Sequence, residues 1–266
     1  MVRELLAAGI TPDALVGVSA GALNATFVAG TPLDRAGEGL VEVWYEVAKN
    51  GIFNAGSPKR LWAVLRQRNS LDPGTKLAAI VEKHCPVADL SDTALPVLVG
   101  TLDIDHNEIA WHDSGLAVPR LMASAAIPGV FPPVVLDGST HVDGGVYAPV
   151  PLSGALRFAP TRLIVLDVSG MDQPLPPNPK SGMASSVTPS SALGILLASL
   201  EALRHRSMDC EKAMVPSSVE VFTIHGGFAG GMLPETASQI PQIIEAGAAA
   251  ARELIARHPE LTADLV

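Results

Sequence analysis

ALVGVSAGALNATF, residues 14–27, is the stretch of this sequence that decides the fold. The apolar run 14–18 is short and carries no charge, which predicts a buried strand. The small residues from 20 to 29 predict a helix directly after it. Ser19 stands where the two elements meet, with one residue between it and each of Gly17 and Gly21. A strand that changes into a helix at a serine between two glycines needs a physical explanation.

This Gly-x-Ser-x-Gly turn has two interpretations. In a nucleophile elbow, a tight turn holds the serine in a strained conformation, and the glycines remove the Cβ atoms that would clash. The serine then lies at a helix N-terminus, where the dipole and the free N–H groups favour developing negative charge. In the alternative, Ser19 is an ordinary N-cap at a strand-to-helix turn. The five residues alone leave both interpretations open.

Composition limits the classes of protein to which the chain can belong. Its 266 residues suffice for one large domain or at most two small ones. Hydrophobic residues make up 48% and charged residues 17%, which excludes global disorder. The net charge of −9 argues against a nucleic-acid-binding surface and against strong attraction to anionic lipid.

Cysteine usage and the N-terminal residues bear on the compartment. Cys85 and Cys210 form no disulfide or metal-binding pattern, which favours a reducing, cytoplasmic location. The first residues lack the basic-then-apolar layout of a signal peptide. The uncharged run 14–33 is long enough to span a bilayer, but it contains glycines, a proline, a serine and an asparagine. Because buried segments of α/β proteins have the same composition, we expect no transmembrane segment.

Hydrophobic periodicity predicts an alternation of strands and helices. This alternation indicates an α/β sheet that is at least partly parallel. The Pro-rich stretch 170–189 is expected to be a surface loop inside the domain, because strands continue beyond it. The predicted helices are 2–8, 20–29, 40–48, 58–67, 75–83, 190–206 and 238–257, and the predicted strands are 14–18, 96–102, 108–111, 134–136, 163–168 and 219–224.

A Ser-His-Asp triad fits the sequence poorly. In α/β-hydrolases several strands precede the elbow, and the acid and the histidine follow the serine in that order. Here only a short segment precedes Ser19, and the late histidines are His205, His225 and His258. His205 and His258 lie among arginines on predicted helices, where we expect them to face solvent. No histidine is distinguished as a general base.

A carboxylate is better placed. Asp143 follows a strand-like run and directly precedes Gly144 and Gly145, which would let the backbone turn sharply and leave the carboxylate open to a neighbour. The alternative is a plain Asp-Gly turn, of which Asp137-Gly138 is an example nearby. Alone this signal is weak.

Three blocks taken together resemble the patatin-like phospholipase family: GVSAGALNA at 17–25, ASAAIPGVFPP at 123–133, and DGG at 143–145. The likeness is strongest from residue 5 to about 168. The resemblance implies a three-layer α/β/α fold with a mostly parallel central sheet, in one domain over residues 1–266. It implies hydrolysis of lipid carboxylic esters by a Ser-Asp dyad, with no histidine, metal or cofactor. Ser19 matches the nucleophile and Asp143 its proton acceptor, and the motif glycines are Gly17, Gly21, Gly144 and Gly145.

The chemistry of such a dyad is simple. Asp143 would accept the Ser19 proton as the hydroxyl attacks the ester, giving an acyl-enzyme that water then releases. Ser124, in the middle block, is expected to serve packing or positioning rather than catalysis.

The sequence departs from the family at its start. The family opens with a strand and a loop of pattern Gly-Gly-Gly-x-[Arg/Lys]-Gly, whose N–H groups form the oxyanion hole. ELLAAGI, at 4–10, matches the end of the helix that follows that loop, so strand and loop are absent ahead of it. We therefore expect a sheet that lacks a strand beside 14–18. Two hypotheses stand: a serine acyl hydrolase, or a catalytically impaired relative that binds lipid or a partner.

Substrate preference is not readable from the sequence. The basic segment 58–68 could contact a membrane surface transiently, although a solvated helix face is the default. The uncharged stretch 190–200 could form a lid or the wall of an acyl channel, although a core helix is the default. The expected partner is a lipid ester, and head group, acyl length and oligomeric state stay open.

Overall fold

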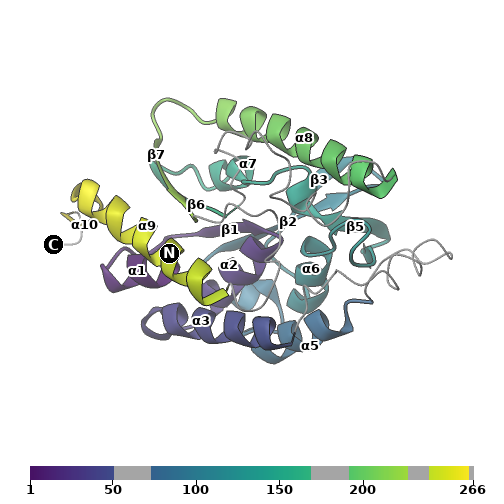
Figure 1. The fold of residues 1–266 in the computed structure, drawn as a ribbon, viewed down its shortest axis with the longest axis horizontal. Helices are drawn as coiled ribbons and strands as arrows, with labels where there is room; N and C mark the ends of the chain where they lie inside the picture. Colours follow the sequence, from purple (N-terminus) through teal and green to yellow (C-terminus); the bar gives the residue numbers. More distant parts are fainter. Residues whose placement is uncertain (51–72, 169–191, 227–239, 264–266) are drawn as a thin grey trace.

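The computed structural model describes residues 1–50, 73–168, 192–226 and 240–263 (Figure 1). It is a mixed α/β structure, about 50% helical. The strands are β1 (Leu15–Val18), β2 (Val97–Asp103), β3 (Glu108–His112), β4 (Val134–Leu136), β5 (Ser139–Asp143), β6 (Arg162–Asp167) and β7 (Glu220–His225). Most of these match the predicted strands to within a residue or two.

The helices follow the same pattern. They are α1 (Val2–Ala7), α2 (Ala20–Gly30), α3 (Leu33–Lys49), α5 (Thr75–His84), α6 (Ala117–Ser124), α7 (Leu152–Leu156), α8 (Ala192–Ala213), α9 (Ile240–Arg257) and α10 (Glu260–Ala263), with short 3₁₀ turns at Leu90–Asp92 and Gly144–Val146. The predicted helix 58–67 and the predicted loop 170–189 lie outside the described residues.

The strands form two sheets. In the larger one, β1 pairs in parallel with β2, and β3, β5 and β4 extend the sheet in antiparallel directions. β6 and β7 form a second, parallel pair. The predicted α/β class with parallel central strands is confirmed.

β1 and β5 pair with the same edge of β2, one after the other along its length. Val18, the last residue of β1, lies opposite Gly100 of β2, and Asp143, the last residue of β5, lies opposite the next residue, Thr101. β3 pairs with β2 along 99–103, so β1 and β5 must both occupy the other edge. Since β1 runs parallel and β5 antiparallel to β2, their carboxyl ends run toward one another. The residues that follow β1 and end β5 therefore meet over the 100–101 peptide.

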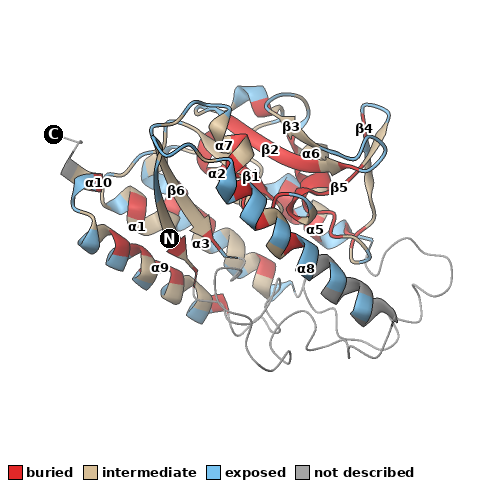
Figure 2. Cartoon of the chain, turned by 90° about the horizontal axis from the view of Figure 1, so that it is seen from above, coloured by how far each residue is buried: buried red, intermediate tan, exposed pale blue. Residues whose placement is uncertain are grey.

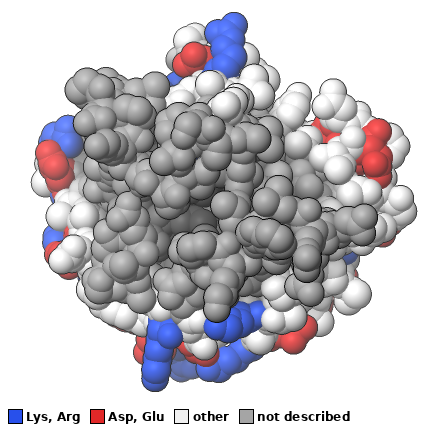
Figure 3. All heavy atoms as spheres, turned by 45° about the vertical axis from the view of Figure 1, so that its right-hand side comes forward, with Lys and Arg blue, Asp and Glu red and all other residues white. Residues whose placement is uncertain are grey.

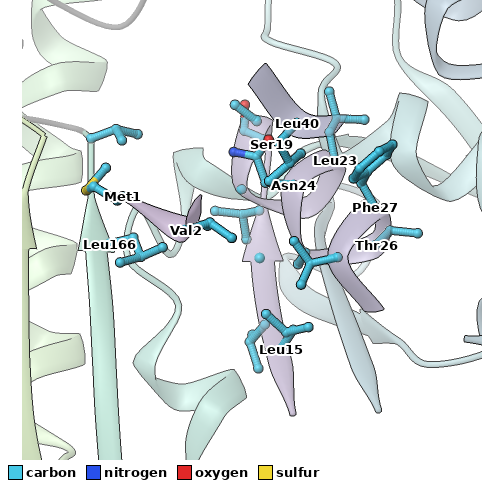
Figure 4. A pocket seen from close by; sticks show the side chains of 18 of the residues that line it. Met1, Val2, Leu15, Ser19, Leu23, Asn24, Thr26, Phe27, Leu40 and Leu166 are labelled. Carbon is cyan, nitrogen blue, oxygen red and sulfur yellow. The ribbon is translucent and has the colours of Figure 1, made fainter. Parts of the chain in front are cut away.

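A cavity separates the two sheets. Among the described residues no ladder joins β1 to β6, and both strands line one cavity of about 1110 Å³ together with α1 and α9. In Figure 4 Met1 and Leu166 of β6 lie on one side of it and Leu15 of β1 on the other, with Val2 between them. The expected absence of a strand beside β1 thus corresponds to an apolar gap in the sheet.

Helices cover both faces of the strands. In Figure 1, α7 and α8 lie on one side, while α1, α2, α3 and α9 lie on the other. The main core packs α2, α5 and α6 against β1 and β2, with Val99 and Leu90 fully buried. A smaller core joins α1 and α9 to β6 and β7 around Ile224 and Ala251. Buried residues concentrate on the inner faces (Figure 2).

Several elements differ from the sequence prediction. The helices α6, α7 and α10 were not predicted, and α8 continues to Ala213 instead of ending at residue 206. α3 begins at Leu33 instead of residue 40, because Gly37 lies inside it rather than before it. A Cβ at Gly37 would lie 2.9 Å from the Cα of Arg3, so this glycine lets α1 and α3 approach closely. The helix α6 was not expected, since Pro119 stands in it; proline is tolerated there because it lies in the first turn.

The surface bears charges of both signs. On the face shown in Figure 3, acidic and basic side chains are intermixed around the rim of the molecule. Within the described ranges no helix has the length and apolar character needed to cross a bilayer.

Candidate active site

Ser19 has the backbone conformation of an elbow. Its φ of 54° and ψ of −131° lie where non-glycine residues are strained, at a cost of about 1–3 kcal/mol. Its N–H donates to Oγ of Ser124 over 2.9 Å, and that hydroxyl in turn donates to the carbonyl of Gly100 over 2.7 Å. The predicted positioning role of Ser124 is therefore supported by geometry: it ties the elbow to β2 from α6.

The two glycines of the elbow are not equivalent. A Cβ at Gly17 would lie 2.2 Å from the carbonyl oxygen of Gly21, so the turn closes only with glycine there. A Cβ at Gly21 would meet no atom within 4 Å among the described residues. The expectation that both glycines relieve clashes is right for Gly17 and wrong for Gly21, because Gly21 faces open space in the first turn of α2.

The two glycines after Asp143 let the backbone pass close to neighbouring atoms. A Cβ at Gly144 would lie 2.5 Å from the carbonyl oxygen of Gly100, so glycine lets the chain cross the end of β1. A Cβ at Gly145 would lie 3.0 Å from Oδ1 of Asp143, and the N–H of Gly145 donates to that same oxygen over 2.7 Å. The Gly144–Gly145 turn thus holds the Asp143 carboxylate by a hydrogen bond.

Asp143 is a buried carboxylate, 3% exposed. Burial raises its pKa to about 6, while the Ser19 hydroxyl, the Gly145 N–H and the charge of Arg204 oppose the rise. A carboxyl group with this pKa is ionised at neutral pH and still basic enough to accept a proton.

Ser19 and Asp143 face one another without a fully formed hydrogen bond. The hydroxyl is near enough to act on the pKa of the carboxyl group. Yet Oδ2 of Asp143 is buried and has no hydrogen-bond partner of good geometry among the described residues. Long or misaligned contacts of this kind are common in unliganded sites and tighten when substrate binds.

The histidines are engaged elsewhere. Of all the histidines, which lie within the described ranges, only His84 lines the cavity at Ser19, and its Nε2 is 2.8 Å from a Glu46 oxygen. His225 lies 3.4 Å from Asp167, at the ends of β7 and β6. His205 and His258, expected to face solvent, are half-buried. None is among the groups that act on the pKa of Asp143.

One residue of the site has no signal in the sequence. Arg204, on α8, is 8% exposed and donates from Nε to the carbonyl of Gly145 over 2.9 Å. It stands in a segment, ALRHRSMD at 202–209, whose charges are typical of a solvated helix face. The contact with Gly145 appears only once α8 packs across the turn after β5.

The part of the chain that carries Ser19 and Asp143 matches a known protein family. The family model of the patatin-like phospholipases matches residues 1–156, which is more than half of the chain. The chain belongs to the patatin-like phospholipase family. The matched region contains both the elbow at Ser19 and the turn at Asp143.

Patatin-like relatives are distant in sequence. The chain is similar to Lysophospholipase NTE1 of Mycosarcoma maydis, 29% identical over 98 residues, which are 37% of this chain and 5% of that protein. It is 29% identical over 89 residues to the Yarrowia lipolytica protein of the same name, covering 34% of this chain and 6% of that one. An uncharacterized NTE family protein of Mycobacterium tuberculosis is 27% identical over 111 residues, 38% of this chain and 31% of that protein. The matches thus span at most a third of these relatives.

The middle block of this patatin-like chain, 123–133, connects the two other blocks. It covers the end of α6 and the passage to β4, and the carbonyl of Ala126 accepts the N–H of Asp143 over 3.0 Å. Through Ser124 and Ala126 the block therefore contacts both the turn at Ser19 and the end of β5 at Asp143.

Proposed function

We propose that the chain is a serine acyl hydrolase that cleaves carboxylic esters of lipids, such as phospholipids, lysophospholipids or acylglycerols. The observation that carries the proposal is the meeting of the ends of β1 and β5 on adjacent residues of β2. It brings a strained serine and a buried carboxylate together from segments far apart in the sequence. Membership of the patatin-like family supports lipid hydrolysis as the reaction class.

The proposed reaction has two halves. Ser19 Oγ attacks the ester carbonyl while its proton passes to Asp143, and collapse of the tetrahedral intermediate returns that proton to the departing alcohol. The acyl group is left on Ser19. Asp143 then takes a proton from a water molecule as that water attacks the acyl carbon. When the carboxylic acid leaves, Asp143 returns the proton to Ser19 Oγ. The reaction consumes one ester and one water and needs no other reactant.

The negative oxygen of the intermediate needs donors. Ser19 is the N-cap of α2, so the first N–H groups of that helix point toward the region where this charge develops. We propose that a second set of donors comes from a Gly-rich loop ahead of Met1, joined to a strand that fills the gap between β1 and β6. The half-unit α1–β1 supports this, since a parallel strand before α1 would complete a βαβ unit at that edge.

The cavity fits a lipid tail. It reaches from Ser19 and Asp143 past apolar side chains of α2, α3 and α5, including Leu23, Trp44 and Ile80. An acyl chain is favoured there because it buries apolar surface against these side chains.

The test is labelling with a fluorophosphonate, which reacts with activated serines. The chain should be labelled, Ser19→Ala should abolish labelling, and Asp143→Asn should reduce it while His225→Ala leaves most of it. Circular dichroism must show that each variant is folded. Labelling that survives Ser19→Ala would place the nucleophile elsewhere, and a folded but inactive His225→Ala variant would replace the dyad by a triad.

The second candidate is a catalytically impaired protein that binds lipid or a partner. The edge of β1 that enters no ladder among the described residues supports it. If the loop expected at that edge is missing from the site, loss of one oxyanion donor costs about 10²–10³ in kcat. Absence of labelling, together with saturable binding of a fluorescent fatty acid to the folded chain, would support this candidate over the first.

A further inference from the structure

The helix α8 holds the segment after Asp143 at three points. Arg204 donates to the carbonyl of Gly145, Ser207 donates to the carbonyl of Tyr147, and Glu211 accepts from both the N–H and the hydroxyl of Ser153, over 2.6 and 2.8 Å. Residues spaced by three and four lie on one face of a helix. In Figure 2 this part of α8 lies across the strands with buried and exposed residues alternating.

The burial of two of these residues is unusual. Arg204 is 8% exposed and Glu211 3%, whereas arginine and glutamate are seldom buried without partners. The partners of Glu211 lie well beyond the turn, at the start of α7. Arg204 alone of the three contacts Gly145, the residue whose N–H donates to Asp143.

Gly145 therefore connects Arg204 to Asp143 through two hydrogen bonds. Gly145 gives its N–H to Oδ1 of Asp143 over 2.7 Å and receives Nε of Arg204 at its carbonyl over 2.9 Å. Because Gly145 has no side chain to restrict it, contacts from outside the turn must fix its backbone orientation. A rotation of this residue would remove the hydrogen bond to the carboxylate.

We propose that Arg204 is a positioning residue for Asp143, holding Gly145 in the orientation that aims its N–H at the carboxylate. The consequence for catalysis rests on the proposed function, whereas the contact between Arg204 and Gly145 does not depend on it. Arg204 acts through Gly145 and is not assigned a contact with substrate.

The charge of Arg204 adds an effect on titration. It acts to lower the pKa of Asp143, against the larger effect of burial. Register places Asp103 of β2, His112 of β3 and His141 of β5 on the same sheet face as Asp143. Thr101 lies among them and is hydrogen-bonded to both histidines. None of these groups is among the causes that shift the pKa of Asp143. Loss of Arg204 should therefore raise that pKa.

The experiment compares Arg204→Met, Arg204→Lys and the control Glu211→Gln in the whole chain. Glu211→Gln weakens the attachment of α8 at Ser153 but leaves the contact at Gly145. Carboxyl-carbon NMR, with the Asp143 resonance assigned by its loss in Asp143→Asn, measures the titration directly. We expect Arg204→Met to raise the Asp143 midpoint by about one pH unit, and both Arg204→Lys and Glu211→Gln to leave it near the wild-type value.

Activity gives the second measurement. For Arg204→Met the acidic limb of kcat/KM should move to higher pH, and the plateau should fall about tenfold or more, through kcat rather than KM. An unchanged NMR midpoint, or losses no greater than those of Glu211→Gln at equal melting temperature, would overturn the proposal. If the wild type neither hydrolyses esters nor reacts with fluorophosphonate, the proposed function fails, while the NMR titration still decides the role of Arg204.

Discussion

At the scale of single residues, Asp143 combines a functional requirement with a cost in stability. Its carboxyl group is buried, and burial raises its pKa from 3.8 to about 6. The charged form is therefore less favourable in the folded state than in the unfolded state. For one group this difference is worth about 3 kcal/mol at neutral pH.

This cost gives a prediction for Asp143→Asn. Below pH 4 the carboxyl group is protonated in both states, so the wild type and the variant should be equally stable. Between pH 4 and 6 the unfolded state loses its proton first, and the wild type should lose stability as pH rises. Above pH 6 the variant should be more stable by up to about 3 kcal/mol, measured by urea unfolding at several pH values. A variant less stable than the wild type at pH 8 would contradict this.

The candidate catalytic residues could be proposed from the sequence, whereas the residues that hold them in place could not. Ser19 and Asp143 stand in motifs whose glycines can be recognised in sequence, and their candidate roles followed from the resemblance. Arg204 and Gly100 stand in no motif: Arg204 donates to the backbone carbonyl of Gly145, and the backbone carbonyl of Gly100 accepts from Ser124. Such contacts depend on how α8 and β2 pack, and no local pattern encodes them.

At the scale of elements, the strand, turn and helix from 15 to 30 depend on one glycine more than the other. Gly17 faces the carbonyl of Gly21 at a distance that excludes a Cβ, whereas Gly21 lies in the first turn of α2 with open space beside it. The sequence pattern treats the two as equal.

The matched pair Gly17→Ala and Gly21→Ala tests this difference. Gly17→Ala should lower the melting temperature markedly and abolish fluorophosphonate labelling, because the turn cannot close around an added methyl group. Gly21→Ala should keep or raise the melting temperature, since alanine is favoured over glycine in a helix by about 1 kcal/mol. Equal destabilisation by both substitutions would show that the open space at Gly21 is filled in solution.

Prediction of the elements themselves was most accurate where a short apolar run or a run of small residues gave a local signal. β4 and the start of α2 were placed to the residue, since apolar runs and glycine stops are local signals. The start of α3 was predicted at residue 40 but lies at Leu33, and Gly37, inside the helix, allows α1 and α3 to pack closely. No ladder joins β1 to β6 among the described residues, and both strands are hydrophobic enough to face a further strand.

At the scale of the whole molecule, the gap between β1 and β6 links stability to activity. Leu15, Val16 and the apolar residues of β6 line this cavity, and the outer backbone groups of β1 and β6 enter no ladder in the described part of the chain. Unpaired groups in an apolar setting are costly, and open strand edges favour aggregation.

A version extended ahead of Met1 by a strand and a Gly-rich loop should therefore differ from the 266-residue chain in two ways. It should express with less aggregation and melt at a higher temperature. Its esterase activity should be at least about 10²-fold greater, because the loop supplies oxyanion donors. Equal turnover and equal melting temperatures for the two proteins would mean that the oxyanion hole is built from other residues.

The alignment of β1 and β5 along one edge of β2 also has a consequence for the order of folding. Neither strand end alone creates a reactive serine; both must dock on β2 before Ser19 and Asp143 come within reach. Contacts between such distant segments require closure of long loops and form late relative to local helices. The proposed reactivity of Ser19 should thus report completed topology: during refolding, helical signal should recover first, and reaction with fluorophosphonate should follow only when β1 and β5 have both docked on β2.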